Sequence, residues 1–174
     1  MTDSTYKEKL AGLNTFLFDV DGVFTDGHVL LYPGLDPVRS FFTRDAYAVQ
    51  HAIKEGYRII IISGGRSQGV MDSFARLGVK EVYLGTNEKS VLFDQLVKDG
   101  LDPTTTAYMG DDIPDLRTMT RVAFPCCPSD AAPEIKAVSA YISRYAGGNG
   151  CVRDLLEQAM KVQDRWMTEN AHTW

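Results

Sequence analysis

The chain has 174 residues, of which 44% are hydrophobic and 24% are charged. This balance is typical of a globular protein with a buried core and argues against a disordered chain. A net charge of −5 and a pI near 5.1 disfavour a general nucleic-acid binder, so we expect no nucleic-acid partner.

The opening residues, MTDSTYKEKL, lack the apolar stretch of a signal peptide, and no apolar run approaches the roughly 20 residues of a membrane helix. The three cysteines, Cys126, Cys127 and Cys151, show no metal-ligand spacing. We therefore expect reduced cysteines that pack in the core, a cytoplasmic protein and no membrane partner.

After a polar leader over 1–12, apolar runs predict strands at 14–20, 57–63, 81–85 and 106–110, with a further candidate at 140–143. Helical stretches are expected at 45–55, 67–77, 89–99 and 113–120, and a last helix follows a glycine-rich loop within 146–174. Strands that alternate with helices predict an α/β fold, a Rossmann-like parallel sheet wrapped by helices in one domain over 1–174.

The stretch 24–42 interrupts this alternation. It contains two apolar runs on either side of YPGLDP, a cluster of turn-forming residues. We expect a β-hairpin inserted after the first strand and no large cap domain.

Unusual polar residues follow several of the expected strands. Asp19 and Asp21 follow the first strand, Ser63 ends the second, and Asp111 and Asp112 follow the strand at 106–110. Because ligands of open α/β sheets bind at the carboxyl ends of the strands, we expect these side chains to meet in one crevice, joined by Lys89 at a helix start. An oxygen-only cluster suits Mg²⁺ better than zinc.

The order of these motifs, DVDGVFTDG, then serine, lysine and GDDIPD, resembles the haloacid dehalogenase-like phosphatase superfamily. FFTRDAYAV and GGNGCVRDLLE are similar to its capless sugar-acid phosphatases, whose type member hydrolyses 3-deoxy-D-manno-octulosonate 8-phosphate. The resemblance implies a Mg²⁺-dependent phosphatase of lipopolysaccharide biosynthesis, acting on an eight- or nine-carbon 3-deoxy-2-ulosonate phosphate.

The resemblance also implies roles for individual residues. Asp19 would be the nucleophile and Asp21 the general acid and base. Asp19, the Asp21 backbone carbonyl and Asp111 would hold the metal. Ser63, with Gly64, and Lys89 would bind the phosphoryl group, and the residues that orient Lys89 or metal-bound water would be Asp112 and Asp115.

Substrate recognition is implied for Thr43, Arg44, Asp45 and Arg66, with Arg44 pairing with a substrate carboxylate. A surface arginine near a helix start is the alternative for Arg44. In the resembled proteins the hairpin forms the core of a homotetramer whose neighbouring subunits close each site. A hairpin folded onto its own subunit is the alternative here. The glycine-rich segment would be a tail that closes over the site, or a plain loop before the last helix.

Two departures from the family pattern affect the substrate. This chain has RDAYA where the family more often has RDGxG, and SGGR where it often has TGR or TGE, which places Gly65 at a sugar-selecting position. A phosphatase for another small sugar phosphate is therefore one alternative. Another is a non-catalytic assembly module, like the C-terminal domain of some sialic-acid activating enzymes.

Overall fold

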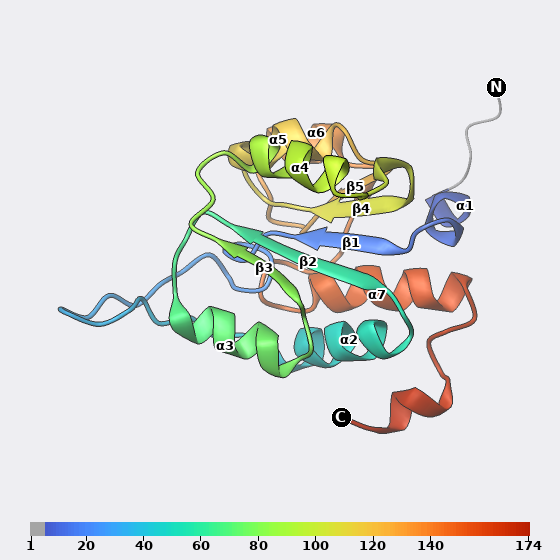
Figure 1. Ribbon diagram of the computed structural model, residues 1–174, viewed down its shortest axis with the longest axis horizontal. Coiled ribbons are helices and arrows are strands. Elements are labelled where there is room, and N and C mark those ends of the chain that lie inside the picture. Colours follow the sequence, from blue (N-terminus) through green and yellow to red (C-terminus); the bar gives the residue numbers. More distant parts are fainter. Residues whose placement is uncertain (1–5) are drawn as a thin grey trace.

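The computed structural model describes residues 6–174, which form a six-stranded, all-parallel sheet with helices on both faces (Figure 1). The strand order is β3-β2-β1-β4-β5-β6, with bounds β1 Thr15–Phe18, β2 Arg58–Ser63, β3 Glu81–Leu84, β4 Thr106–Met109, β5 Phe124–Cys127 and β6 Tyr141–Ile142. The chain leaves β1 towards one edge of the sheet and returns to β4 on the other side of β1. The topological switch point, where such folds bind ligands, therefore lies between β1 and β4.

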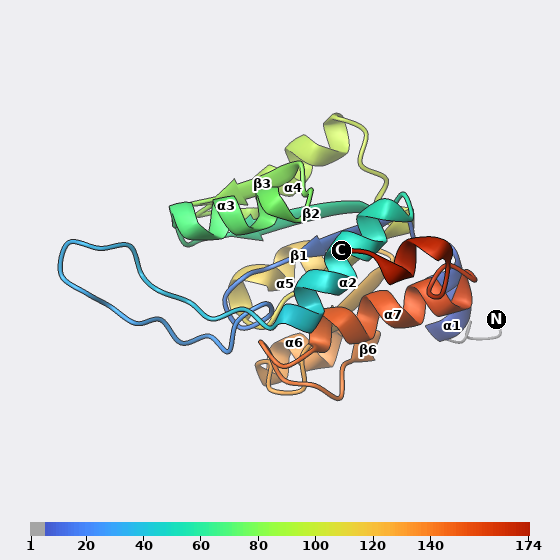
Figure 2. The ribbon, with the colours of Figure 1, turned by 90° about the horizontal axis from the view of Figure 1, so that it is seen from below.

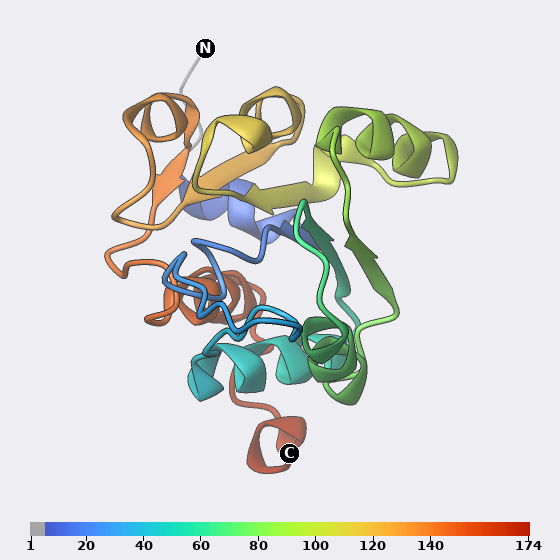
Figure 3. The ribbon, with the colours of Figure 1, turned by 90° about the vertical axis from the view of Figure 1, so that its left-hand side faces the viewer.

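The helices form two layers. Figure 3 shows one layer above the sheet and one below it: α4 (Lys89–Lys98), α5 (Ile113–Met119) and α6 (Pro133–Val138) cover one face, and α2 (Thr43–Lys54), α3 (Gln68–Arg76) and α7 (Cys151–Val162) cover the other. The remaining helices are short: α1 (Tyr6–Ala11), η1 (Pro103–Thr105) and η2 (Glu169–His172). No helix within residues 6–174 is long and apolar enough to cross a membrane.

Both faces of the central strands are buried, which explains their continuous apolar runs. Side chains alternate between two cores: Phe16 and Phe18 of β1 face the layer that contains α2 and α7, whereas Leu17 faces α4. Phe18 is level with Ile61 of β2 and Met109 of β4, so the residues that follow β1 and β4 emerge side by side.

The sequence-predicted α/β fold with a parallel sheet and flanking helices is confirmed. The runs at 14–20, 57–63, 81–85, 106–110 and 140–143 each contain a strand. We did not predict β5, whose sequence FPCC carries a proline, nor the short α6. Of the expected polar leader, residues 6–11 form α1, and residues 1–5 lie outside the described part of the chain.

The structure does not show the expected regular hairpin over 24–42. The loop projects far from the sheet (Figure 2), and its two arms pair only between Leu30 and Val38, each N–H donating to the other carbonyl at 3.0 Å. The turn-forming cluster makes the predicted reversal, since the Leu35 N–H donates to the Tyr32 carbonyl. Without neighbouring strands to continue the pairing, the arms remain an irregular loop.

Candidate active site

A tight turn after β1 places Asp19 and Asp21 at the switch point. The Val20 carbonyl accepts hydrogen bonds from the N–H groups three, four and five residues further on, so the backbone curls immediately after Asp19. Gly22, at the centre of the curl, has φ +84°, and a Cβ there would lie 2.0 Å from Oδ2 of Asp111. Only glycine allows the chain to pass so close to the Asp111 carboxylate.

Asp19 is 8% exposed and is held by two donors. Its Oδ1 accepts the Val20 N–H at 2.7 Å and lies 2.9 Å from Nζ of Lys89. Both donors approach the same oxygen. Asp19 also lines the cavity at this edge of the sheet. Its other oxygen, Oδ2, is therefore the candidate nucleophile.

Asp115 forms an ion pair with Lys89. Its Oδ1 accepts from Lys89 Nζ at 2.6 Å and from the Tyr108 hydroxyl at 2.7 Å, while its Oδ2 accepts the Asp111 N–H at 3.1 Å. Asp115 is only 1% exposed, and a Cβ on Gly110 would collide with its carboxylate. Because protein donors engage both its oxygens, the Asp115 carboxylate is held in one orientation beside Lys89 at the wall of the cavity.

The carboxylates outnumber the cations that face them. Burial, together with the negative charge of Asp115, raises the pKa of Asp19 to about 7, and burial beside Asp19 raises the pKa of Asp111 to about 7. One ligand oxygen from each of Asp19, Asp111 and Asp115 lies within 4.8 Å of the others. A hard divalent cation fits this arrangement, because it bonds to oxygen and would offset the excess negative charge.

The cavity has a volume of about 460 Å³. It is lined by the residues that follow β1, β2 and β4 and by the start of α4, among them Asp19, Asp21, Ser63, Gly64, Lys89, Asp111 and Asp112. Ser63 ends β2, and its Oγ accepts the Gly65 N–H at 3.1 Å. Asp112 caps α5 by accepting the Ile113 N–H. The cavity thus combines carboxylates, a lysine and a hydroxyl.

The sequence of this chain is similar to that of a characterised phosphatase. The chain is 31% identical over 158 residues to 3-deoxy-D-manno-octulosonate 8-phosphate phosphatase KdsC of Escherichia coli strain K12, with 90% of this chain and 84% of the relative covered. The chain belongs to the KdsC-type phosphatase family. This confirms the resemblance to haloacid dehalogenase-like sugar-acid phosphatases. No protein-family model matches the chain.

Solved structures of KdsC-type proteins are similar to this structure over most of the chain. The Moraxella catarrhalis phosphatase, in complex with magnesium ion, phosphate ion and KDO, has a TM-score of 0.86, 30% identity and 91% coverage of each chain. The Yersinia pestis phosphatase has a TM-score of 0.88 and 29% identity, with 91% of this chain and 86% of that chain covered.

Four residues expected near the substrate lie outside this cavity. Thr43, Arg44 and Asp45 form the first turn of α2, where Asp45 is buried and accepts the Arg153 N–H at 2.7 Å. Arg44 lines a different cavity, of about 490 Å³, next to α7. Arg66 is exposed and packs beside Gly85, where a Cβ would lie 2.2 Å from its Nε.

The glycine-rich segment contacts the turn that follows β1. The Gly148 N–H donates to the Val23 carbonyl at 2.9 Å, and a Cβ on Gly147 would lie 2.0 Å from the Gly22 carbonyl oxygen. The segment therefore supports the backbone that carries Asp21, and glycine is needed for this close approach.

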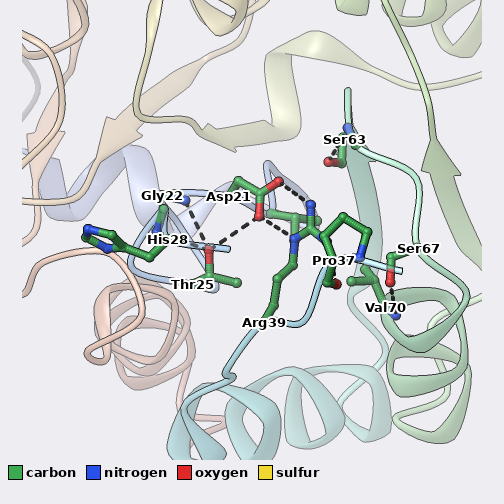
Figure 4. A network of polar contacts seen from close by, with 12 residues as sticks. Asp21, Gly22, Thr25, His28, Pro37, Arg39, Ser63, Ser67 and Val70 are labelled. Carbon is green, nitrogen blue, oxygen red and sulfur yellow. Dashed lines mark hydrogen bonds and ion pairs between the residues drawn. The ribbon is translucent and has the colours of Figure 1, made fainter. Parts of the chain in front are cut away.

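One contact in the site was not predicted from the sequence. Arg39, on the projecting loop, binds both carboxylate oxygens of Asp21, at 2.7 Å through Nε and 3.0 Å through Nη2 (Figure 4). A signal was present, because Arg39 is the only lysine or arginine between Asp21 and Thr43.

Proposed function

We propose that this protein is a Mg²⁺-dependent phosphatase that hydrolyses a 3-deoxy-2-ulosonate phosphate, either 3-deoxy-D-manno-octulosonate 8-phosphate or a nine-carbon analogue. One observation carries the proposal: the buried Asp19 carboxylate is fixed by Lys89 and the Val20 N–H at the wall of a cavity that also holds Ser63. The KdsC-type relatives, which are 3-deoxy-D-manno-octulosonate 8-phosphate phosphatases, support this substrate class.

Mg²⁺ would be held by the carboxylates of Asp19 and Asp111 and by the backbone carbonyl of Asp21. The bound cation would reduce the repulsion between an anionic nucleophile and an anionic phosphate. Lys89 and Ser63 would bind the phosphoryl oxygens and stabilise their charge in the transition state.

The reaction would proceed in two steps. The free oxygen of Asp19 attacks phosphorus, the bond from phosphorus to the sugar oxygen breaks, and the protonated Asp21 gives its proton to that oxygen. Water then attacks the aspartyl-phosphate while Asp21 takes up a proton, which releases phosphate and restores the Asp19 carboxylate. Arg39 engages one lone pair on each Asp21 oxygen, so lone pairs remain for this proton.

Substrate recognition would use residues of more than one subunit. Arg44 is exposed but lies outside the cavity of its own chain, so it would reach the carboxylate of a substrate bound by a neighbouring subunit. Thr43 and Arg66, which are exposed, would contribute to recognition, and the buried Asp45 would support the first turn of α2 through the Arg153 N–H. A homotetramer assembled through the projecting loop would bring these surfaces together.

Steady-state rates on a panel of phosphates test the proposal. The panel contains eight- and nine-carbon ulosonate phosphates, glucose 6-phosphate and p-nitrophenyl phosphate, each with Mg²⁺ and with excess EDTA. We expect the highest kcat/KM on a ulosonate phosphate and loss of turnover with EDTA. A preference for glucose 6-phosphate would refute the substrate class, and full turnover in EDTA would refute the metal requirement.

A further inference from the structure

Arg39 is fixed against the Asp21 carboxylate. The arginine side chain is 7% exposed, whereas that of Asp21 is 33% exposed. The guanidinium binds the two Asp21 oxygens through Nε and Nη2, and its Nη1 donates to the Pro37 carbonyl at 3.2 Å. A planar fork with two parallel hydrogen bonds fixes both the position and the plane of a carboxylate.

Within residues 6–174, one other side chain contacts the Asp21 carboxylate. It is that of Thr25, whose hydroxyl lies 3.5 Å from Oδ1, which is a weak contact (Figure 4). A partly exposed aspartate with only that contact would occupy several rotamers. Arg39 therefore determines which way the Asp21 carboxylate points.

The space for the guanidinium is provided by Gly65. A Cβ at this residue would lie 3.0 Å from Nη2 of Arg39 and 3.3 Å from Oδ2 of Asp21. Gly65 lines the cavity together with Asp21, and any larger residue at this position would press on the ion pair. Arg39 itself does not line the cavity among the described residues, and it acts through Asp21.

The arm that carries Arg39 is docked by other contacts as well. Oδ2 of Asp36 accepts the Gln68 N–H at the start of α3 at 3.0 Å, and the Phe41 ring packs 5.6 Å from the Phe74 ring. Loss of the Arg39 side chain should therefore release Asp21 while the arm stays in place.

We propose that Arg39 is the positioning residue of Asp21, holding its carboxylate towards the reacting phosphoryl group in both half-reactions. This inference rests on the proposed acid and base role of Asp21. Small displacements of a reacting group can lower a rate by about 100-fold, so the effect of Arg39 should appear in kcat.

Kinetics of loop variants test the inference. Arg39→Ala should lower kcat by about 10- to 100-fold on both a ulosonate phosphate and p-nitrophenyl phosphate, with KM within about twofold. Arg39→Lys, which keeps the charge but not the fork, should be intermediate. Asp36→Ala is the matched control, because it removes an anchor of the same arm and should keep kcat within about twofold.

A double-mutant cycle separates positioning from a structural role. If Arg39 acts only through Asp21, Arg39→Ala should change the residual kcat by less than about twofold in an Asp21→Ala background. Equal losses in both backgrounds, or a loss reproduced by Asp36→Ala, would overturn the inference. So would an increased kcat, or a raised KM confined to the ulosonate phosphate.

The two proposals fail differently. If the parent protein is active and Arg39→Ala matches it, only the positioning role is refuted. If the parent hydrolyses none of the phosphate esters with Mg²⁺, the proposed function is refuted and the role of Arg39 with it.

Discussion

Two glycines with similar backbone angles show how the site depends on single residues. Gly22 has φ +84° and Gly34 has φ +75°, so alanine is strained at both positions. A Cβ at Gly22 would meet the Asp111 carboxylate at 2.0 Å, whereas a Cβ at Gly34 would have no atom within 4 Å. The difference between the two substitutions therefore isolates the contact with Asp111.

We expect Gly22→Ala to destabilise the protein by about 1–3 kcal/mol and to remove both activity and stabilisation by Mg²⁺, because Asp111 must move. Gly34→Ala should cost about 1 kcal/mol and leave activity unchanged. Thermal unfolding with and without Mg²⁺, together with p-nitrophenyl phosphate assays, measures both. Equal loss of activity in the two variants would contradict this account.

At the residue scale, the sequence predicts those site members that directly follow strands. Asp19, Asp21, Ser63 and Asp111 converge because parallel strands end at one edge of the sheet. The contact of Arg39 with Asp21 was not predictable in this way, because it depends on an irregular loop without periodicity. The hydroxyl of Tyr108 was missed because that residue lies inside an apolar strand.

At the scale of elements, the first turns of α2 and α7 are joined by a buried carboxylate. Asp45 in α2 accepts the Arg153 N–H of α7, while its Oδ2 is buried without a hydrogen-bond partner among the described residues. Burial is the main cause that raises the pKa of Asp45 to about 6. The folded state thus binds a proton more tightly than the unfolded state between about pH 4 and pH 6, and this stabilisation is lost as the pH rises.

Asp45→Asn removes this titration but keeps an acceptor for Arg153. The free energy of unfolding of the variant, relative to that of the parent, should increase by about 1–3 kcal/mol as the pH rises from 4.5 to 7.5. Urea unfolding at both pH values measures the change, with Asp99→Asn at an exposed position as the control. If the free energy of unfolding changes with pH in the same way for Asp45→Asn and the parent, burial does not raise the pKa of Asp45.

Prediction of whole elements succeeds where one signal dominates. The residues directly before Asp19 and Ser63, FLF and IIII, are apolar and favour strands. Glycines follow α2, α3 and α4 where these helices end. In contrast, β5 contains Pro125, which weakens the strand signal. The turn at Tyr32–Leu35 was predictable, but the pairing of the arms was not, since it depends on neighbours outside the local sequence.

At the scale of the whole molecule, the projecting loop leaves apolar side chains uncovered. Leu30 is 59% exposed and Leu31 is 74% exposed, and they lie with Val29, Tyr32, Leu35 and Val38 on one segment. A group of exposed large apolar side chains on one segment is typical of an interaction surface. We therefore expect the loop to mediate self-association, in agreement with the proposed homotetramer.

Replacing Leu30 and Leu31 with lysine should dissociate the assembly in light scattering at micromolar concentration. Val91→Lys is the matched control, because Val91 is also 59% exposed but lies on α4, away from the loop. The dissociated variant should lose more activity on ulosonate phosphates than on p-nitrophenyl phosphate, because in the proposed homotetramer neighbouring subunits would complete recognition of the sugar. A parent protein that is monomeric in solution would refute this role of the loop.

Asp19 is the proposed carrier of the phosphoryl group. Asp21→Asn should block hydrolysis of the aspartyl-phosphate, while p-nitrophenyl phosphate can still phosphorylate Asp19 because its leaving group needs no proton. The measurement is mass spectrometry of Asp21→Asn after acid quench with Mg²⁺ and p-nitrophenyl phosphate. We expect one phosphoryl group on the peptide that contains Asp19 and none when Asp19→Asn is added. Release of p-nitrophenol without a phosphorylated protein, or a phosphoryl group on another residue, would contradict the account.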